Sequence, residues 1–149
     1  MILKNLNKSF LINLVLIFLI FILDRISKIY VIYLDNNFSG SEIFSSKFLN
    51  IYLIWNEGIA FGLLSFQKEN LYDILSLIIL FVILAIFFIS IKSRGIKKYC
   101  YLMILGGALG NFFDRIFYKA VPDFIDFHVG NFHWFIFNIA DIFISLGII

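Results

Sequence analysis

The sequence has little cysteine, histidine or charge, and each shortage excludes a class of protein. Its single cysteine, Cys100, excludes an internal disulfide framework and a metal site built on CxxC pairs. Two histidines, His128 and His133, are too few for a histidine-based metal cluster without help from carboxylates. Only 15% of the residues are charged, against about 25% in an average soluble domain. An ordinary soluble fold is therefore excluded.

Long apolar runs fill most of the remaining sequence. Hydrophobic residues make up 62% of the 149 residues, and the mean hydropathy is +0.98. A helix that crosses the hydrocarbon core of a membrane needs about 20 mostly apolar residues. We therefore expect an all-α membrane protein that forms a single domain, residues 1–149. Its four transmembrane helices are expected at about residues 9–34, 74–91, 99–117 and 133–149.

The basic residues beside these spans predict their orientation. Lys4 and Lys8 precede the first span, and residues 92–98, KSRGIKK, join the second and third spans without an acid. Basic loops of membrane proteins stay on the cytoplasmic side. We therefore expect both termini in the cytoplasm and the loops at 35–70 and 116–132 outside the cell membrane.

The first outer loop has the composition of β-strands. Its stretch SKFLNIYLIWNEGIAFGLL, residues 46–64, is rich in β-branched and aromatic residues, with turn signals at Asn56 and Gly58. We expect a small extracytoplasmic β-rich region between the first and second helices, lying at the membrane surface.

Three acids interrupt the apolar spans: Asp24, Asp114 and Asp141. An ionised carboxylate in hydrocarbon costs at least about 2.5 kcal/mol, so intramembrane acids usually pair or carry a function. Counted along the predicted helices at 1.5 Å per residue, Asp114 and Asp141 lie about 8 and 10 Å below the outer surface. Asp24 comes to a similar level. The common depth predicts one site.

Asp114 and Asp141 each follow an asparagine by three residues, in NFFD and NIAD. Residues i and i+3 share a helix face, so Asn111 and Asn138 are expected to support the acid on their own helix. Two carboxylates that meet in a low dielectric hold one proton between them, and such a pair can activate water for hydrolysis. Catalysis is one interpretation; a proton or ion relay and plain packing are the alternatives that the residues leave open.

The polar neighbours of these acids have plain structural alternatives too. Asp24 and Lys28, four residues apart, fit a simple helix ion pair. Arg115 fits an interfacial anchor that extends toward the headgroups. Asp123, in VPDFID, fits a solvated loop.

Five short blocks together resemble the lipoprotein signal peptidases, also called signal peptidase II. In chain order they are DRISK (24–28), NEGIAF (56–61), GGALGNFFDR (106–115), VPDFID (121–126) and FNIAD (137–141). The blocks stand in the right order over nearly the whole chain, which makes them far more specific together than any one alone.

The resemblance implies an aspartic endopeptidase of the bacterial cell membrane with its active site toward the extracytoplasmic face. Such an enzyme removes the signal peptide from a prolipoprotein, cutting N-terminal to a cysteine that already carries diacylglycerol. It needs no metal or other cofactor. The expected partners are diacylglyceryl-prolipoprotein substrates, membrane lipids and globomycin-type cyclic peptide inhibitors, with no nucleic acid, and the chain is expected to act as a monomer.

By position, Asp114 and Asp141 match the catalytic pair of the family. The other matching residues are expected to support the site or bind substrate: Asn111, Arg115, Asn138, Asn56, Gly58, Ala60, Phe61, Asp123, Asp24 and Lys28.

The sequence departs from the family pattern at Pro122, Phe135 and Ile142, none of which is a carboxylate. The alternative from another class is a small proton-coupled membrane carrier that uses the buried acids as a relay. Transport needs a polar path to both faces, and the inner halves of the last three spans are almost wholly apolar, which argues against a carrier.

Overall fold

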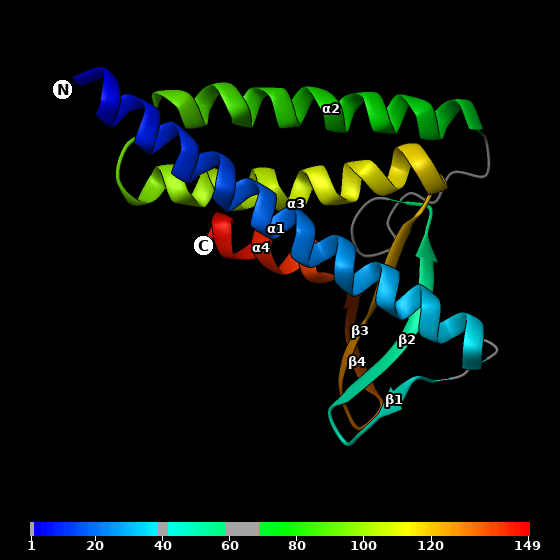
Figure 1. Cartoon of the computed structure of the whole chain (residues 1–149). Helices are drawn as coiled ribbons and strands as arrows, with labels where there is room; N and C mark the ends of the chain where they lie inside the picture. Colours follow the sequence, from blue (N-terminus) through cyan, green and yellow to red (C-terminus); the bar gives the residue numbers. More distant parts are fainter. Residues whose placement is uncertain (1, 39–41, 59–68) are drawn as a thin grey trace.

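The computed structural model describes residues 2–38, 42–58 and 69–149, which form helices and one small sheet (Figure 1). The helices are α1 (Ile2–Phe38), α2 (Glu69–Lys92), α3 (Ile96–Tyr118) and α4 (Ile139–Ile148). The strands are β1 (Phe44–Ser45), β2 (Leu49–Asn56), β3 (Val121–Val129) and β4 (Phe132–Phe137). They form one antiparallel sheet in the order β1-β2-β3-β4. The expectation of an all-α chain is therefore wrong.

The sheet takes strands from two segments of the chain. β1 and β2 lie between α1 and α2, where the sequence predicts strands, but β3 and β4 lie between α3 and α4. β2 pairs with β3 from Leu49↔Phe127 to Asn56↔Val121. This pairing brings the polar end of β2 next to the start of β3.

The fourth predicted span, residues 133–149, is wrong in its first part. β4 continues to Phe137, and α4 begins at Ile139 and has only ten residues. The stretch 132–137, FHWFIF, is rich in aromatic residues that fit a pleated strand. A short apolar run does not by itself distinguish a strand from a buried helix. Ten helical residues cover about 15 Å, roughly half of a hydrocarbon core.

Two helices in the described part of the chain are long and apolar enough to cross a membrane. They are Lys8–Asn37 within α1 and Tyr72–Lys92 within α2. α1, α2 and α3 overlap the first three predicted spans, at 9–34, 74–91 and 99–117. The prediction of four transmembrane helices is not confirmed.

α3 is the central helix, and its glycines let α1 and α4 approach closely. A Cβ added at Gly106 would lie 2.8 Å from Cβ of Ile20 in α1. A Cβ added at Gly107 would overlap the carbonyl oxygen of Ala140 in α4. Small residues at such positions allow backbones to pack side by side. Both close contacts lie near the polar residues of the site.

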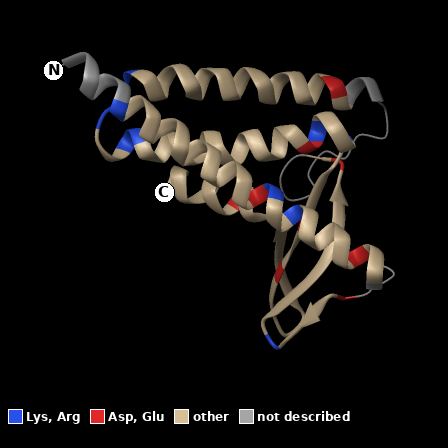
Figure 2. Cartoon of the chain, viewed as in Figure 1, with Lys and Arg blue, Asp and Glu red and all other residues tan. Residues whose placement is uncertain are grey.

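Charged residues gather at the ends of the helix bundle and in one central cluster (Figure 2). Basic residues lie at the end where α1 starts and α2 meets α3, away from the sheet. Long stretches of α2 and α3 between the two ends are uncharged. Apolar contacts between α2 and α3, centred on Ile83, Leu102 and Leu105, form the core there.

Candidate active site

A closed cluster of charged side chains lies where α1 crosses α3. Arg25 donates from Nη1 and Nη2 to the two oxygens of Asp114, at 2.5 and 2.7 Å. Lys28 Nζ donates to Asp114 Oδ2 at 2.7 Å and lies 3.0 Å from the carboxylate of Asp24. None of the four residues is more than 7% exposed. Two cations thus balance two carboxylates, as buried charges require.

Asp24 also ties this cluster to α4. Its Oδ1 accepts the backbone N–H of Ala140 at 3.0 Å, and its Oδ2 accepts from Arg25 Nη2 at 2.8 Å. A simple helix ion pair of Asp24 with Lys28 is therefore too narrow a description. Arg25 is absent from the site residues predicted from the sequence, although an arginine beside an acid inside an apolar run is a usable signal.

Asn111 connects the charged cluster to Asp141. Its Oδ1 accepts from Lys28 Nζ at 2.8 Å, and its Nδ2 donates to Asp141 Oδ1 at 2.8 Å. Among the described residues, Asn111 is joined to Asp114 of its own helix only through Lys28, which donates to both side chains. The side chain instead reaches across to α4.

Asp141 stands in the first turn of α4. The side chain of the N-cap Asn138 accepts the backbone N–H of Asp141, and Asp141 Oδ2 accepts the backbone N–H of Asn138, both at 3.2 Å. This reciprocal pattern is a capping box, and a carboxylate at this position also interacts favourably with the helix dipole. A depth counted along a helix from Trp134 is wrong because the chain runs as a strand as far as Phe137.

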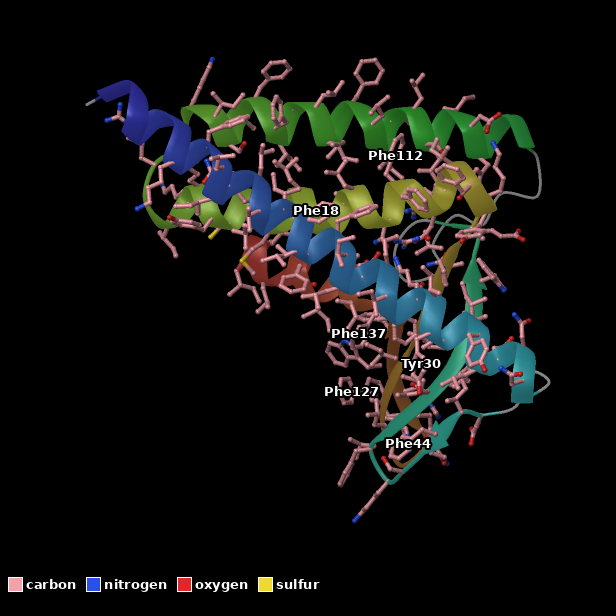
Figure 3. All side chains as sticks on the ribbon, viewed as in Figure 1. Phe18, Tyr30, Phe44, Phe112, Phe127 and Phe137 are labelled. Atoms are coloured by element: carbon pink, nitrogen blue, oxygen red, sulfur yellow. The ribbon has the colours of Figure 1, made fainter. Side chains whose placement is uncertain are left out.

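A groove of about 410 Å³ opens in the angle between β4 and α4. Asp141, which is half-buried, lines it and gives it an ionisable group. The other lining residues come from the end of β4 and from the face of α4: Trp134, Phe135, Phe137, Ile142, Ser145 and Leu146. Phe137 packs against Phe127 of β3, with 5.8 Å between ring centroids (Figure 3). Asp141 can therefore meet a bound molecule.

Asp123, on β3, is 3% exposed, so the alternative of a solvated loop acid is wrong. Asn56 Nδ2 donates to its Oδ2 at 2.9 Å, and Asn138 Nδ2 donates to its Oδ1 at 2.6 Å. Burial, together with the negative charge of Asp141, raises the pKa of Asp123 to about 6. Both hydrogen-bond donors are neutral amides, so no cation contacts this carboxylate among the described residues.

Arg115 links the end of α3 to the turn after β2. Its Nη2 donates to the carbonyl oxygen of Gly58 at 3.1 Å, and Asn56 Oδ1 accepts the N–H of Gly58 at 2.9 Å. Arg115 is only 6% exposed, which contradicts the alternative of a headgroup anchor. Ala60 and Phe61 lie outside the described residues.

The contacts separate the acids into two kinds. Both oxygens of Asp114 are paired with cations, and its side chain has no exposed surface. Asp123 and Asp141 are held by neutral donors and share Asn138. The shared proton of an acid pair needs a carboxylate that cations do not already occupy, so these contacts favour Asp123 over Asp114 as the partner of Asp141.

In the described ranges, no group of three or more His, Cys, Asp or Glu residues is arranged to hold a metal ion.

Comparisons with known proteins agree on one family. A family model described as "Signal peptidase (SPase) II" matches residues 16–149. A lipoprotein signal peptidase of Pelagibacter ubique (strain HTCC1062) is 48% identical over 141 residues, which cover 95% of this chain and 85% of the relative. Another, of Anaplasma marginale (strain Florida), is 40% identical over 144 residues, with 95% and 82% covered.

Solved structures show the same likeness. A bacterial membrane enzyme determined by the in meso method at 2.3 Å resolution has a TM-score of 0.72 and 30% identity, over 91% of this chain and 82% of its own. A second one, at 1.9 Å resolution, has a TM-score of 0.70 and 28% identity, over 91% and 86%.

Proposed function

The chain belongs to the signal peptidase II family, and we propose that Asp123 and Asp141 are the acid pair with which it cuts its substrates. As a member of this aspartic peptidase family, it removes signal peptides from prolipoproteins. The alternative of a proton-coupled carrier is not supported. The observation that carries the proposed pair is the contact of one residue, Asn138, with both carboxylates.

The two acids of the proposed pair share one proton. With a pKa of about 6, Asp123 holds a proton far more readily than an ordinary aspartate. Two facing carboxylates in a low dielectric titrate as a unit, with one protonated and one ionised form. Asp141 reaches the open groove, so it is the member that meets water.

Hydrolysis then follows in two steps. Asp141 takes a proton from water as the water oxygen attacks the carbonyl carbon, and Asp123 gives its proton to the carbonyl oxygen. In the second step the C–N bond breaks, the amine nitrogen takes the proton from Asp141, and a hydroxyl proton of the intermediate returns to Asp123. Asn56, Asn111 and Asn138 hold the two carboxylates in place throughout.

The finer features of substrate and location are part of this proposal. We propose that the scissile bond precedes a cysteine that carries diacylglycerol, and that the chain acts as a monomer among membrane lipids, open to globomycin-type inhibitors. The site is proposed to face the extracytoplasmic side, with both termini cytoplasmic. The basic residues at the bundle end away from the sheet support this orientation (Figure 2).

The test is cleavage of a diacylglyceryl-modified precursor by the purified protein and by three single variants. Asp123→Asn and Asp141→Asn are expected to lose at least about 10²-fold in kcat, because each removes an acid–base partner. The matched control is Asp73→Asn, which changes an exposed acid whose ion pair among the described residues is with exposed Lys119. Full activity of Asp123→Asn would contradict the assignment.

Asp114→Asn distinguishes the two candidate partners of Asp141. If Asp114 balances charge, its variant loses activity in proportion to lost stability but keeps the parent's pH profile. If Asp114 is instead the acid partner of Asp141, Asp114→Asn changes the pH profile of cleavage and Asp123→Asn leaves that profile unchanged.

A further inference from the structure

We propose that the turn between α2 and α3 binds the headgroups of anionic phospholipids, an inference that does not depend on which acids cut the substrate. This basic turn, residues 92–98, carries four cations: Lys92, Arg94, Lys97 and Lys98. The first three are exposed and the fourth is half-buried. The basic turn stands at the end of the bundle away from the sheet, where basic residues gather (Figure 2).

The basic turn holds its shape without help from its cations. Ser93 Oγ donates to the carbonyl oxygen of Ile89 at 2.8 Å, and the N–H of Ser93 donates to that of Ser90 at 3.2 Å. The N–H of Lys98 donates to the carbonyl oxygen of Gly95 at 3.2 Å. In the described part of the chain, none of the four cationic side chains forms an ion pair or a hydrogen bond. All four are therefore available to an external partner.

The acidic side chains that the structure describes lie too far away to neutralise these cations. Residues 74–113 contain no acid, so most of α2 and α3 carries none. On the neighbouring helices, Asp141 of α4 and Asp24 of α1 lie level with Gly107 and Gly110. That level is at least about 13 Å along α3 from the basic turn, whereas a salt bridge joins atoms within about 4 Å.

Two of the cations stand where a helix disfavours them. Lys97 and Lys98 lie in the first turn of α3, which contains no acid. The start of a helix carries a partial positive charge, so cations there lower its stability unless an anion neutralises them. A local cost that nothing nearby in the chain offsets is typical of a functional site. The basic turn therefore suits an anion that comes from outside the protein.

Exposed apolar side chains around the basic turn favour a lipid over a soluble anion. Ile96, between the cations, is 77% exposed, and Ile91 and Tyr99 beside the turn are 60% and 47% exposed. Inorganic phosphate and the backbone of a nucleic acid offer no acyl chain to cover these side chains, whereas a phospholipid joins its phosphate to hydrocarbon. Each Lys or Arg near an anionic lipid surface strengthens the attraction by about five-fold.

The test titrates the purified protein in neutral detergent micelles with dioctanoyl phosphatidylglycerol or dioctanoyl phosphatidylcholine, and native mass spectrometry counts the bound lipid. The parent is expected to bind phosphatidylglycerol at least about 10-fold more tightly, because several cations meet the anionic headgroup. The double variant Lys92→Gln/Lys97→Gln should lose this preference. The matched control, Lys47→Gln/Lys119→Gln, removes the same charge from exposed lysines next to the sheet and should keep it.

Three results would overturn the inference. The first is a parent without any preference between the two lipids. The second is an equal loss of preference in both double variants, which would show a general attraction of charge. The third is displacement of phosphatidylglycerol by the same concentration of glycerol 3-phosphate, which would assign the basic turn to a soluble anion.

Thermal unfolding without added lipid checks that Lys97 does not serve the fold itself. Lys97→Gln is expected to unfold at a temperature no lower than that of the parent, because it removes a cation from the start of α3. A clearly lower temperature would give Lys97 a structural role and contradict the inference. Cleavage of the lipidated precursor by the parent tests the proposed function separately, since no lysine of the basic turn contacts the acid pair.

Discussion

Nδ2 of Asn138 lies 2.6 Å from Oδ1 of Asp123, across the junction between β3 and α4. The same asparagine caps α4, where its backbone N–H donates to Asp141. One residue therefore sets the helix start and the position of both proposed catalytic acids.

Asn138→Ala should lower both stability and rate. Loss of the N-cap costs about 1 kcal/mol of unfolding free energy. Because the variant no longer holds the two acids in position, kcat should fall by about 10-fold or more. Thermal unfolding and precursor cleavage measure the two effects. Asn37→Ala is the control, since Asn37 is exposed and, in the described part of the chain, its side chain donates to a carbonyl of its own helix. Unchanged kcat in Asn138→Ala would contradict its role in positioning.

Lys28→Met should destabilise the protein strongly. It leaves Asp24 and Asp114 with one cation between them, and removal of one partner from a buried ion pair costs about 3 to 5 kcal/mol. Lys119→Met removes an ion pair whose side chains are 65% and 62% exposed, so it should cost less than about 1 kcal/mol. Chemical unfolding in detergent micelles compares the two variants. Similar small losses of unfolding free energy in both variants would show that the charged residues of α1 and α3 do not form a closed network.

Asp123 should make stability depend on pH between about 4 and 6. Its folded pKa of about 6 lies above that of an unfolded aspartate, so the folded state binds the extra proton in this interval. Stability therefore falls as pH rises through the interval, by about 2 to 3 kcal/mol.

Asp123→Asn should remove that decline. The measurement is the unfolding free energy of parent and variant from pH 4 to pH 8, compared as slopes. A parent whose stability rises over this range while that of the variant stays flat would contradict the raised pKa.

Gly107→Ala should shift α4 away from α3. The added Cβ would overlap the carbonyl oxygen of Ala140, which is backbone and has no rotamer to change. Overpacking of this kind costs about 1 to 3 kcal/mol, and displacement of Asp141 should lower kcat further. Unfolding and cleavage measured on one preparation separate the two effects, and a fully active, equally stable variant would show that the helices are not in close contact there.

The first three helices could be predicted from apolar run length, because nothing in 9–34, 74–91 or 99–117 competes with a helix. The start of the fourth helix could not be predicted in this way, because the aromatic residues before Asn138 pack as well in a strand as in a helix. Strand pairing also explains why the sequence misjudged Asp123. Its donors Asn56 and Asn138 stand 67 and 15 residues away, and only the sheet brings them together.

The sequence located Asp141 and its asparagine because they lie three residues apart on one element. It included Lys28 among the site residues but missed both cations as partners of Asp114, for the opposite reason. Arg25 and Lys28 precede Asp114 by 89 and 86 residues, and spacing along the chain carries no information about such a contact.

The contact of Asp24 with the N–H of Ala140 bears on how the molecule assembles. Until α4 docks, that carboxylate lacks one of its donors, and until α1 meets α3 two cations and two acids stand exposed to lipid. Partial bundles are therefore penalised at every stage, and the final arrangement should form in one concerted step. A chain whose last helix is delayed or deleted would leave the Asp24 carboxylate one hydrogen-bond donor short inside the bilayer, a feature by which proteolytic quality control can recognise it.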